Sequence, residues 1–134
     1  MHEGYVFIHD HIFPTLLAVS NQEQQRGLMY VEPPTPVMTF VYGSPGINKF
    51  WMLNTKSPLD ILFCHQGKVS EICYGEPHST RMIGSNLFSD LVIELPYGTS
   101  ESANIKIGHA VGLVSPTPEE VRKIIAQHSG GNFR

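Results

Sequence analysis

Proline and glycine interrupt this chain so often that long helices do not fit within most of it. The 134 residues include 10 prolines and 12 glycines, and four of the prolines stand at positions 33, 34, 36 and 45. Proline lacks the backbone N–H that a helix interior needs, and its ring clashes with the preceding turn. The apolar runs between these breaks are short and rich in β-branched and aromatic residues, which favours strands. We therefore predict an all-β fold, an antiparallel sandwich or small barrel built from about eight short strands.

The expected strands follow these apolar runs. They cover residues 5–8, 16–19, 37–42, 50–53, 61–64, 69–74, 87–95 and 105–114. Between two of them, Gln66-Gly67 indicates a two-residue hairpin turn. In that register Cys73 lies opposite Asp60 and is displaced along the ladder from Cys64, too far for a disulfide. We predict that both cysteines of the chain are free thiols.

Two helices are expected beside the strands. Ser20 and Glu23 have the spacing of a capping box and Gly27 stands at a C-cap position, which brackets a helix over 21–26. A second helix is expected near 118–128, where Thr117 precedes a proline and two glutamates. A length of 134 residues is typical of one domain, so residues 1–134 are expected to form a single domain.

The charge pattern argues against several classes of protein. The net charge is −3, and Arg122-Lys123 is the only adjacent basic pair, so no basic patch for nucleic acid is expected. The first 25 residues contain no lysine or arginine, and no run of apolar residues is long enough for a secretory signal or a membrane span. We expect a soluble protein that is cytoplasmic by default.

Four motifs point to a family. They are Arg26-Gly27-Leu28-Met29, residues 50–55 (FWMLNT), residues 58–63 (PLDILF) and residues 91–98 (LVIELPYG). In this order and spacing they resemble the family called domain of unknown function 192, over about Ala18 to Leu113. The resemblance implies a compact, β-rich, jelly-roll-like domain and no settled activity. This chain departs from the family pattern in two places. Residues 36–39 are PVMT where the family has G-M-L-F, and His109 stands where the family has an aspartate.

Arg26 is the first candidate site residue. It follows a short helix and precedes Leu28 and Met29, so its guanidinium is expected to lie against apolar neighbours. A buried arginine needs an anionic partner, because an unpaired buried charge costs several kcal/mol, on the order of 3 to 5. Asp60 and Glu94 are the candidate partners. Arg26 then either forms a structural ion pair or faces a cleft and binds a carboxylate or phosphate of a ligand.

The aromatic and polar residues of the segment from 50 to 60 complete the candidate site. Trp51 lies in a run that is apolar on both faces, which predicts core packing; alternatively it forms the floor of a ligand site. Asn54, Thr55 and Asp60 bound a turn, and their side chains are expected to bond to backbone groups of the loop or to line a pocket rim. The candidate ligand-binding residues are Arg26, Trp51, Asn54, Thr55, Asp60 and Glu94.

The sequence contains none of the common catalytic or cofactor motifs. His9-Asp10-His11 is the nearest approach to a metal site, but no third ligand has suitable spacing, so no metal or cofactor is expected. Three hypotheses remain. The leading one is a non-catalytic domain that binds a small molecule or protein partner. The alternatives are a hydrolase-like or metal-assisted enzyme with Asp60 or Glu94 as general base, and a structural or assembly accessory, as in a virus particle.

Overall fold

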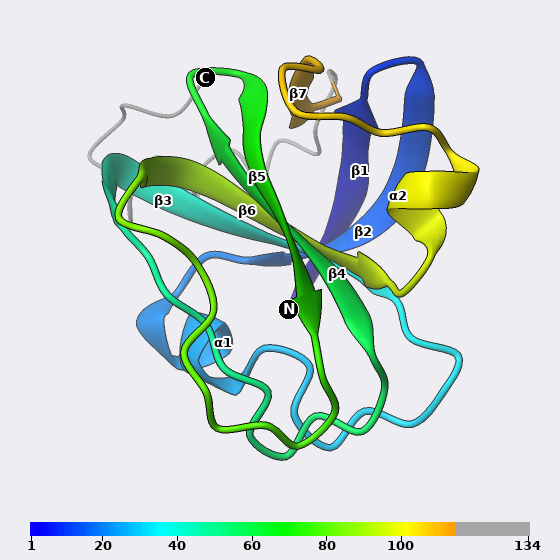
Figure 1. Cartoon of the computed structure of the whole chain (residues 1–134), viewed down its shortest axis with the longest axis vertical. Coiled ribbons are helices and arrows are strands. Elements are labelled where there is room, and N and C mark those ends of the chain that lie inside the picture. Colours follow the sequence, from blue (N-terminus) through cyan, green and yellow to red (C-terminus); the bar gives the residue numbers. More distant parts are fainter. Residues whose placement is uncertain (115–134) are drawn as a thin grey trace.

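The computed structural model describes residues 1–114 and shows a single curled sheet of seven strands (Figure 1). The strands are β1 (His2–Ile8), β2 (His11–Ala18), β3 (Val37–Ile47), β4 (Leu59–His65), β5 (Lys68–Gly75), β6 (Phe88–Pro96) and β7 (Val111–Leu113). Two short helices accompany them, α1 (Asn21–Arg26) and α2 (Thr99–Ser102). The predicted all-β class is confirmed, with the sheet curled into a small, barrel-like form.

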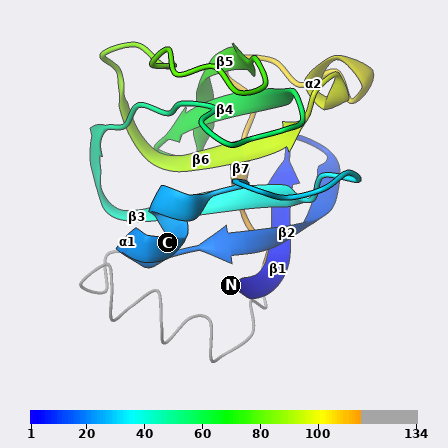
Figure 2. The ribbon, with the colours of Figure 1, turned by 90° about the horizontal axis from the view of Figure 1, so that it is seen from below.

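The strand order in the sheet is β5-β4-β6-β3-β2-β1-β7. One neighbouring pair departs from the expected antiparallel arrangement, because β2 and β3 run parallel. The connection that makes this possible consists of α1 and residues 27–36, and it runs from the end of β2 to the start of β3, as the view from below also shows (Figure 2). A parallel pair needs such a crossover because a tight hairpin reverses the chain direction.

The two edges of the sheet approach each other at one end. Lys68 of β5 forms an isolated antiparallel bridge with Ala110, just before β7, and the N–H of Val111 donates to the carbonyl of Gly67 at 2.9 Å. These contacts satisfy backbone groups that an open edge would leave unpaired. The curled sheet is therefore closed at the end that carries the β4–β5 turn.

Two separate apolar clusters pack on the two faces of the sheet. The first has members from all seven strands and fills the inside of the curl: Val6, Ile8, Leu17, Val19, Val41, Leu62, Cys64, Val69, Leu91, Ile93, Leu95, Ile105 and Val111. The second lies on the outer face of β3, β6 and β4, beneath the long connections: Ala18, Leu28, Met38, Phe40, Met52, Leu59, Ile61, Phe63 and Val92. Side chains alternate between the two faces along each strand, so neighbouring residues of β6 belong to different clusters.

The local features of α1 match the sequence prediction. The Ser20 hydroxyl accepts from the N–H of Glu23 at 3.2 Å, and the Glu23 carboxylate accepts from the N–H of Ser20 at 3.0 Å. Gly27 ends the helix with φ 52° and ψ −131°, a conformation that suits a residue without a side chain. Leu28, which follows, is buried in the outer cluster. The predicted capping box, helix bounds and C-cap are confirmed.

The β4–β5 hairpin has the predicted turn but a different register beyond it. His65 lies opposite Lys68 and Cys64 opposite Val69, as expected. A bulge between residues 63 and 64 then adds one residue on β5, so Cys73 lies opposite Ile61 and not Asp60. Both cysteines are free, as predicted.

Three other expectations concern segments outside these strands. Residues 50–53 are not a strand; Phe50 forms only an isolated bridge with Ile83. Residues 105–107, which follow α2, are irregular or in a turn and form no strand. The helix expected at 118–128 lies outside the described residues. No helix within residues 1–114 is long and apolar enough to span a membrane.

Candidate functional site

A pocket of about 510 Å³ opens on the outer face of the sheet. It lies between α1 with the residues just after it, the segment that follows β3, and the outer face of β3 and β6. Its lining combines polar and apolar groups: Asn21, Gln24, Gln25, Arg26, Gly27, Leu28, Met29, Phe40, Tyr42, Asn48, Lys49, Phe50, Trp51, Thr55 and Glu94. Its volume falls in the range of small-molecule sites, roughly 300 to 1,000 Å³.

Glu94 is the acidic residue of this lining. It lies on β6 opposite Met38 of β3 and Ile61 of β4, and its side chain is 4% exposed. Its Oε1 atom is buried and has no hydrogen-bond partner among residues 1–114. Burial without a compensating partner disfavours the charged form and raises the pKa of the carboxyl to about 8. Glu94 is therefore mostly a neutral acid at pH 7.

Tyr42 lies in the same pocket. It belongs to the face of β3 that also carries Phe40, because these residues are two apart on a strand. Burial raises the pKa of the Tyr42 phenol, and the nearby negative charge of an ionised Glu94 raises it further. Both acidic groups thus keep their protons at neutral pH, and the inner part of the pocket carries hydrogen-bonding groups without charge.

The helix α1 forms one wall. The side chain of Gln24 holds it on the sheet by donating to the carbonyls of Ala18 at 3.2 Å and Val41 at 2.8 Å. Arg26 is the last residue of α1 and is exposed. Its guanidinium has no ion pair or hydrogen bond within the described part of the chain. The expectation of a buried Arg26 paired with Asp60 or Glu94 is wrong, because Arg26 is exposed and no ion pair within residues 1–114 includes it.

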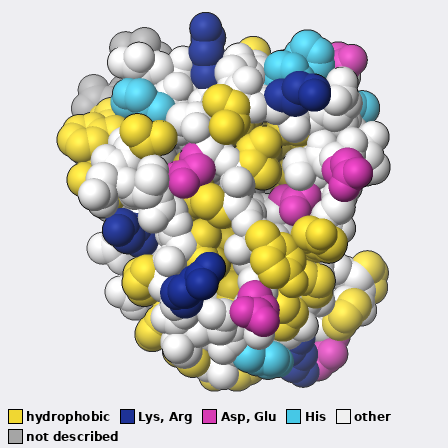
Figure 3. Space-filling view, viewed as in Figure 1, with side chains coloured by type: hydrophobic (Ala, Val, Ile, Leu, Met, Phe, Trp, Pro, Cys, Tyr) yellow, Lys and Arg dark blue, Asp and Glu magenta, His cyan; other side chains and the backbone are white. Residues whose placement is uncertain are grey.

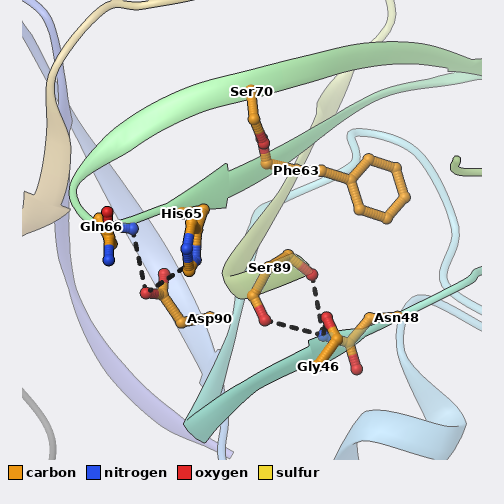
Figure 4. A network of polar contacts seen from close by, with 8 residues as sticks. All are labelled: Gly46, Asn48, Phe63, His65, Gln66, Ser70, Ser89 and Asp90. Atoms are coloured by element: carbon orange, nitrogen blue, oxygen red, sulfur yellow. Dashed lines mark hydrogen bonds and ion pairs between the residues drawn. The ribbon is translucent and has the colours of Figure 1, made fainter. Parts of the chain in front are cut away.

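The segment 48–51 forms the opposite wall. Figure 4 shows the Asn48 side chain reaching from the end of β3 to Ser89 on β6, where it donates to the hydroxyl at 2.8 Å and to the carbonyl at 3.1 Å. The ring of Phe50 packs edge-on against Phe40, with centroids 4.8 Å apart. Trp51 is 44% exposed, so the prediction that it packs in the core is wrong and the residue stands at the pocket mouth.

Asn54 and Thr55 stabilise the turn beneath this wall. Asn54 has a positive φ of 55°, and its side-chain amide donates to the Tyr30 hydroxyl at 2.8 Å. Thr55 is buried and donates to the carbonyl of Leu53 at 3.2 Å. Thr55 lines the pocket and Asn54 does not. Of the expected side-chain bonds to the loop backbone, Thr55 makes one, whereas Asn54 bonds to the side chain of Tyr30 instead.

Asp60 lies on the other face of the sheet from Glu94. One carboxylate oxygen accepts three hydrogen bonds, from the N–H of Gly98 at 3.1 Å and from the N–H and hydroxyl of Ser100 at 2.9 and 2.7 Å. These bonds hold the start of α2 against β4. Asp60 is absent from the pocket lining because its neighbour Ile61, not Asp60 itself, lies opposite Glu94, and adjacent residues of a strand face opposite sides.

The sequence interpretation therefore found four of the pocket residues, Arg26, Trp51, Thr55 and Glu94. It missed Phe40, Tyr42 and Lys49, although the alternation of Phe40 and Tyr42 along β3 was a signal that they share a face. Lys49 has no comparable signal, because its position depends on how the chain turns after β3.

Charged groups elsewhere are dispersed. Figure 3 shows lysine and arginine side chains standing apart from one another on the face it presents. His9 and His109 stack with centroids 3.9 Å apart, and His9 and Asp10 form the β1–β2 turn. Within the part of the chain that the structure describes, no group of three or more histidine, cysteine, aspartate or glutamate residues is placed to hold a metal.

Comparison with known proteins identifies the family. A family model for an uncharacterised group of proteins, "Uncharacterized ACR", matches residues 6–113. The chain belongs to the domain of unknown function 192 family. The match to this family begins at Val6, ahead of the expected start at Ala18, so β1 and β2 are part of the family domain.

Two solved structures share the fold of this family member. A provisionally named transcription regulator from Sinorhizobium meliloti 1021 is 29% identical with a TM-score of 0.79, over 84% of this chain and 94% of the other. A protein of unknown function from Novosphingobium aromaticivorans is 28% identical with a TM-score of 0.77, over 82% of this chain and 84% of the other. None of the curated proteins compared with the chain matches it.

Proposed function

We propose that this member of the domain of unknown function 192 family binds a small molecule, without catalysis, in the pocket between α1, residues 48–51 and β6. The observation that carries the proposal is Glu94, a buried carboxyl with an unpartnered oxygen in the lining of a pocket of about 510 Å³. A bound molecule would supply the hydrogen-bond partner that residues 1–114 do not provide.

The energetic cost of Glu94 supports a functional role. Leaving a buried polar group without a partner costs about 1 to 3 kcal/mol, a large fraction of the 5 to 15 kcal/mol that typically holds a protein folded. The neighbours of Glu94 across the sheet are Met38 and Ile61, so an apolar residue would suit this position better for stability alone. Residues that lower stability in this way are concentrated at binding sites.

The other lining residues have complementary roles. Arg26 and Lys49 are exposed cations at the edge of the pocket, and arginine binds anionic groups through paired hydrogen bonds. Phe50 and Trp51 offer flat aromatic surfaces for an apolar ligand body. Thr55 contributes a buried hydroxyl, and Asn54 supports the site indirectly by holding the adjoining turn.

An enzyme is the second candidate, and one observation favours it. A carboxyl with a pKa of about 8 is suited to proton transfer near neutral pH. That role falls to Glu94 alone, because Asp60 is occupied by its three hydrogen bonds on the other face. The assembly hypothesis anticipated an Arg26 that is paired inside the fold, whereas the residue is exposed.

Thermal unfolding in the presence of a compound panel tests the proposal. The panel contains organic anions, amines, sugars and neutral aromatic compounds. A compound at 100 times its Kd stabilises the folded protein by about 2.7 kcal/mol, which shifts Tm by several degrees. At least one compound should shift the wild type and shift Trp51→Ala much less.

Two controls make the result specific. Tyr97→Ala removes another exposed aromatic side chain, one outside the pocket lining, and should respond to the compound as the wild type does. Arg26→Ala should keep the wild-type Tm without ligand, because changes at exposed, unpaired side chains usually stay within about 0.5 kcal/mol. The proposal fails if every compound that shifts the wild type shifts Trp51→Ala equally. Chemical conversion of a stabilising compound, followed by NMR, would favour the enzyme.

A further inference from the structure

Resting on this proposed function, we infer that the ligand is a small organic anion with an apolar or aromatic body. Its carboxylate or phosphate group pairs with Arg26 and Lys49, and one of its acceptor atoms receives a hydrogen bond from the buried carboxyl of Glu94. The inference names the class of ligand that the pocket selects.

The charge of the lining favours an anion. Its ionisable side chains are Arg26, Lys49, Glu94 and Tyr42. Neither of the two basic groups makes an ion pair within residues 1–114. With Glu94 and Tyr42 protonated, the lining carries the two positive charges of Arg26 and Lys49. The chain as a whole has a net charge of −3, so the pocket attracts anions that the rest of the molecule repels.

The protonation state of Glu94 favours an anionic ligand over a cationic one. The charged side chains that α1 and residues 48–51 contribute to the pocket are those of Arg26 and Lys49, both exposed to solvent. Solvent screens their charges, and they do not offset the burial that raises the pKa of Glu94. A neutral carboxyl donates a hydrogen bond to a ligand oxygen. A cationic amine would gain an ion pair only by ionising Glu94, and it would lie beside the positive charges of Arg26 and Lys49.

The apolar part of the lining defines the body of the ligand. Leu28, Phe40 and Phe50 belong to or pack on the outer apolar cluster, and Trp51 is at the mouth. Burying an apolar or aromatic group against these side chains contributes to affinity in proportion to the area removed from water. Inorganic phosphate lacks such a body and makes only the polar contacts. The pocket therefore favours organic anions over the free inorganic ion.

Calorimetric titration with matched compounds tests the inference. The probes are an aryl carboxylate, the aryl phosphate, the corresponding amide and amine, and inorganic phosphate, each titrated into the full chain. The two aryl anions should bind more tightly than the amide, the amine and inorganic phosphate. Because only the protonated Glu94 donates to the ligand, affinity should fall about tenfold between pH 7 and pH 9. Arg26→Ala and Lys49→Ala should each weaken binding by up to about fivefold.

Variants and a second measurement separate the outcomes. Glu94→Gln still donates a hydrogen bond and should remove the pH dependence. If this variant does not fold, proton uptake by the wild type on ligand binding, measured at pH 8.5 in buffers of different ionisation enthalpy, reports the same coupling between ligand binding and protonation of Glu94.

Lys68→Ala, at an exposed lysine outside the pocket, should bind as the wild type does. Tighter binding of the amine, or affinity that rises with pH, overturns the inference and leaves the proposed function intact. Failure of all probes and of the wider panel overturns both.

Discussion

Replacing Glu94 by glutamine should change how the stability of the folded protein depends on pH. In the unfolded chain the carboxyl has its ordinary pKa of 4.5, and in the folded protein burial raises the pKa to about 8. Between these values the unfolded chain releases a proton that the folded protein keeps. Unfolding therefore becomes more favourable as the pH rises through this window, and the effect levels off above the folded pKa.

The expected magnitude follows from the size of this window. Each unit of pKa corresponds to about 1.4 kcal/mol, so the rise from 4.5 to about 8 amounts to roughly 5 kcal/mol if burial is complete. Glutamine has no proton to lose in this range. The free energy of unfolding of the wild type, minus that of Glu94→Gln, should therefore decrease by several kcal/mol between pH 5 and pH 9.

Urea denaturation at a series of pH values measures this difference. Subtracting the variant removes the contribution of all other titrating groups, provided that the m-values agree. Glu76→Gln, at an exposed glutamate, serves as the matched control and should give a curve parallel to that of the wild type. If the Glu94→Gln curve is also parallel to the wild type, the carboxyl ionises normally in the folded protein, and the argument from its burial is refuted.

Three further predictions concern the surrounding structure. Asp60→Ala should destabilise the fold by roughly 3 kcal/mol or more by urea denaturation, because it leaves the start of α2 without its acceptor, while ligand affinity stays unchanged. Gly27→Ala should cost about 1 to 3 kcal/mol in the same assay, because φ is 52°; an unchanged midpoint would contradict the assigned helix end. Burial raises the pKa of the Cys64 thiol, and burial also raises the pKa of the Cys73 thiol, to about 11. Alkylation of both cysteines at pH 8 should therefore be slow until urea is added. Fast modification of the native protein would contradict this.

The parts of the fold that could be predicted from the sequence are those that short-range physics determines. The helix over 21–26 was bracketed by a capping box and a glycine, and each of these signals acts within a few residues. The Gln66-Gly67 turn was predicted in the same way. The register beyond that turn was not, because the bulge near residue 63 arises from how the whole strand fits the curled sheet.

The errors at the candidate site have a common physical cause. Apolar content alone does not distinguish a strand from a connection that packs on a sheet, so residues 50–53 were assigned to a strand. Their apolar character is explained by Phe50, which covers the outer cluster, while Trp51 faces outward. The sequence groups Glu94 with Asp60 because both are candidate anionic partners of Arg26. Which side of the sheet each one faces depends on strand register, and this cannot be read without knowing how the strands pair.

The alternation of side chains along β6 separates the positions that face the pocket from the packing inside the curl. Ile93 and Leu95 contribute to the interior of the curl, and Val92 and Glu94 face the outer layer. Substitutions at positions that face the pocket leave the interior packing untouched, since the backbone of the sheet stands between them. One curled sheet can thus carry differently shaped and charged pockets on its outer face while the packing inside the curl is retained.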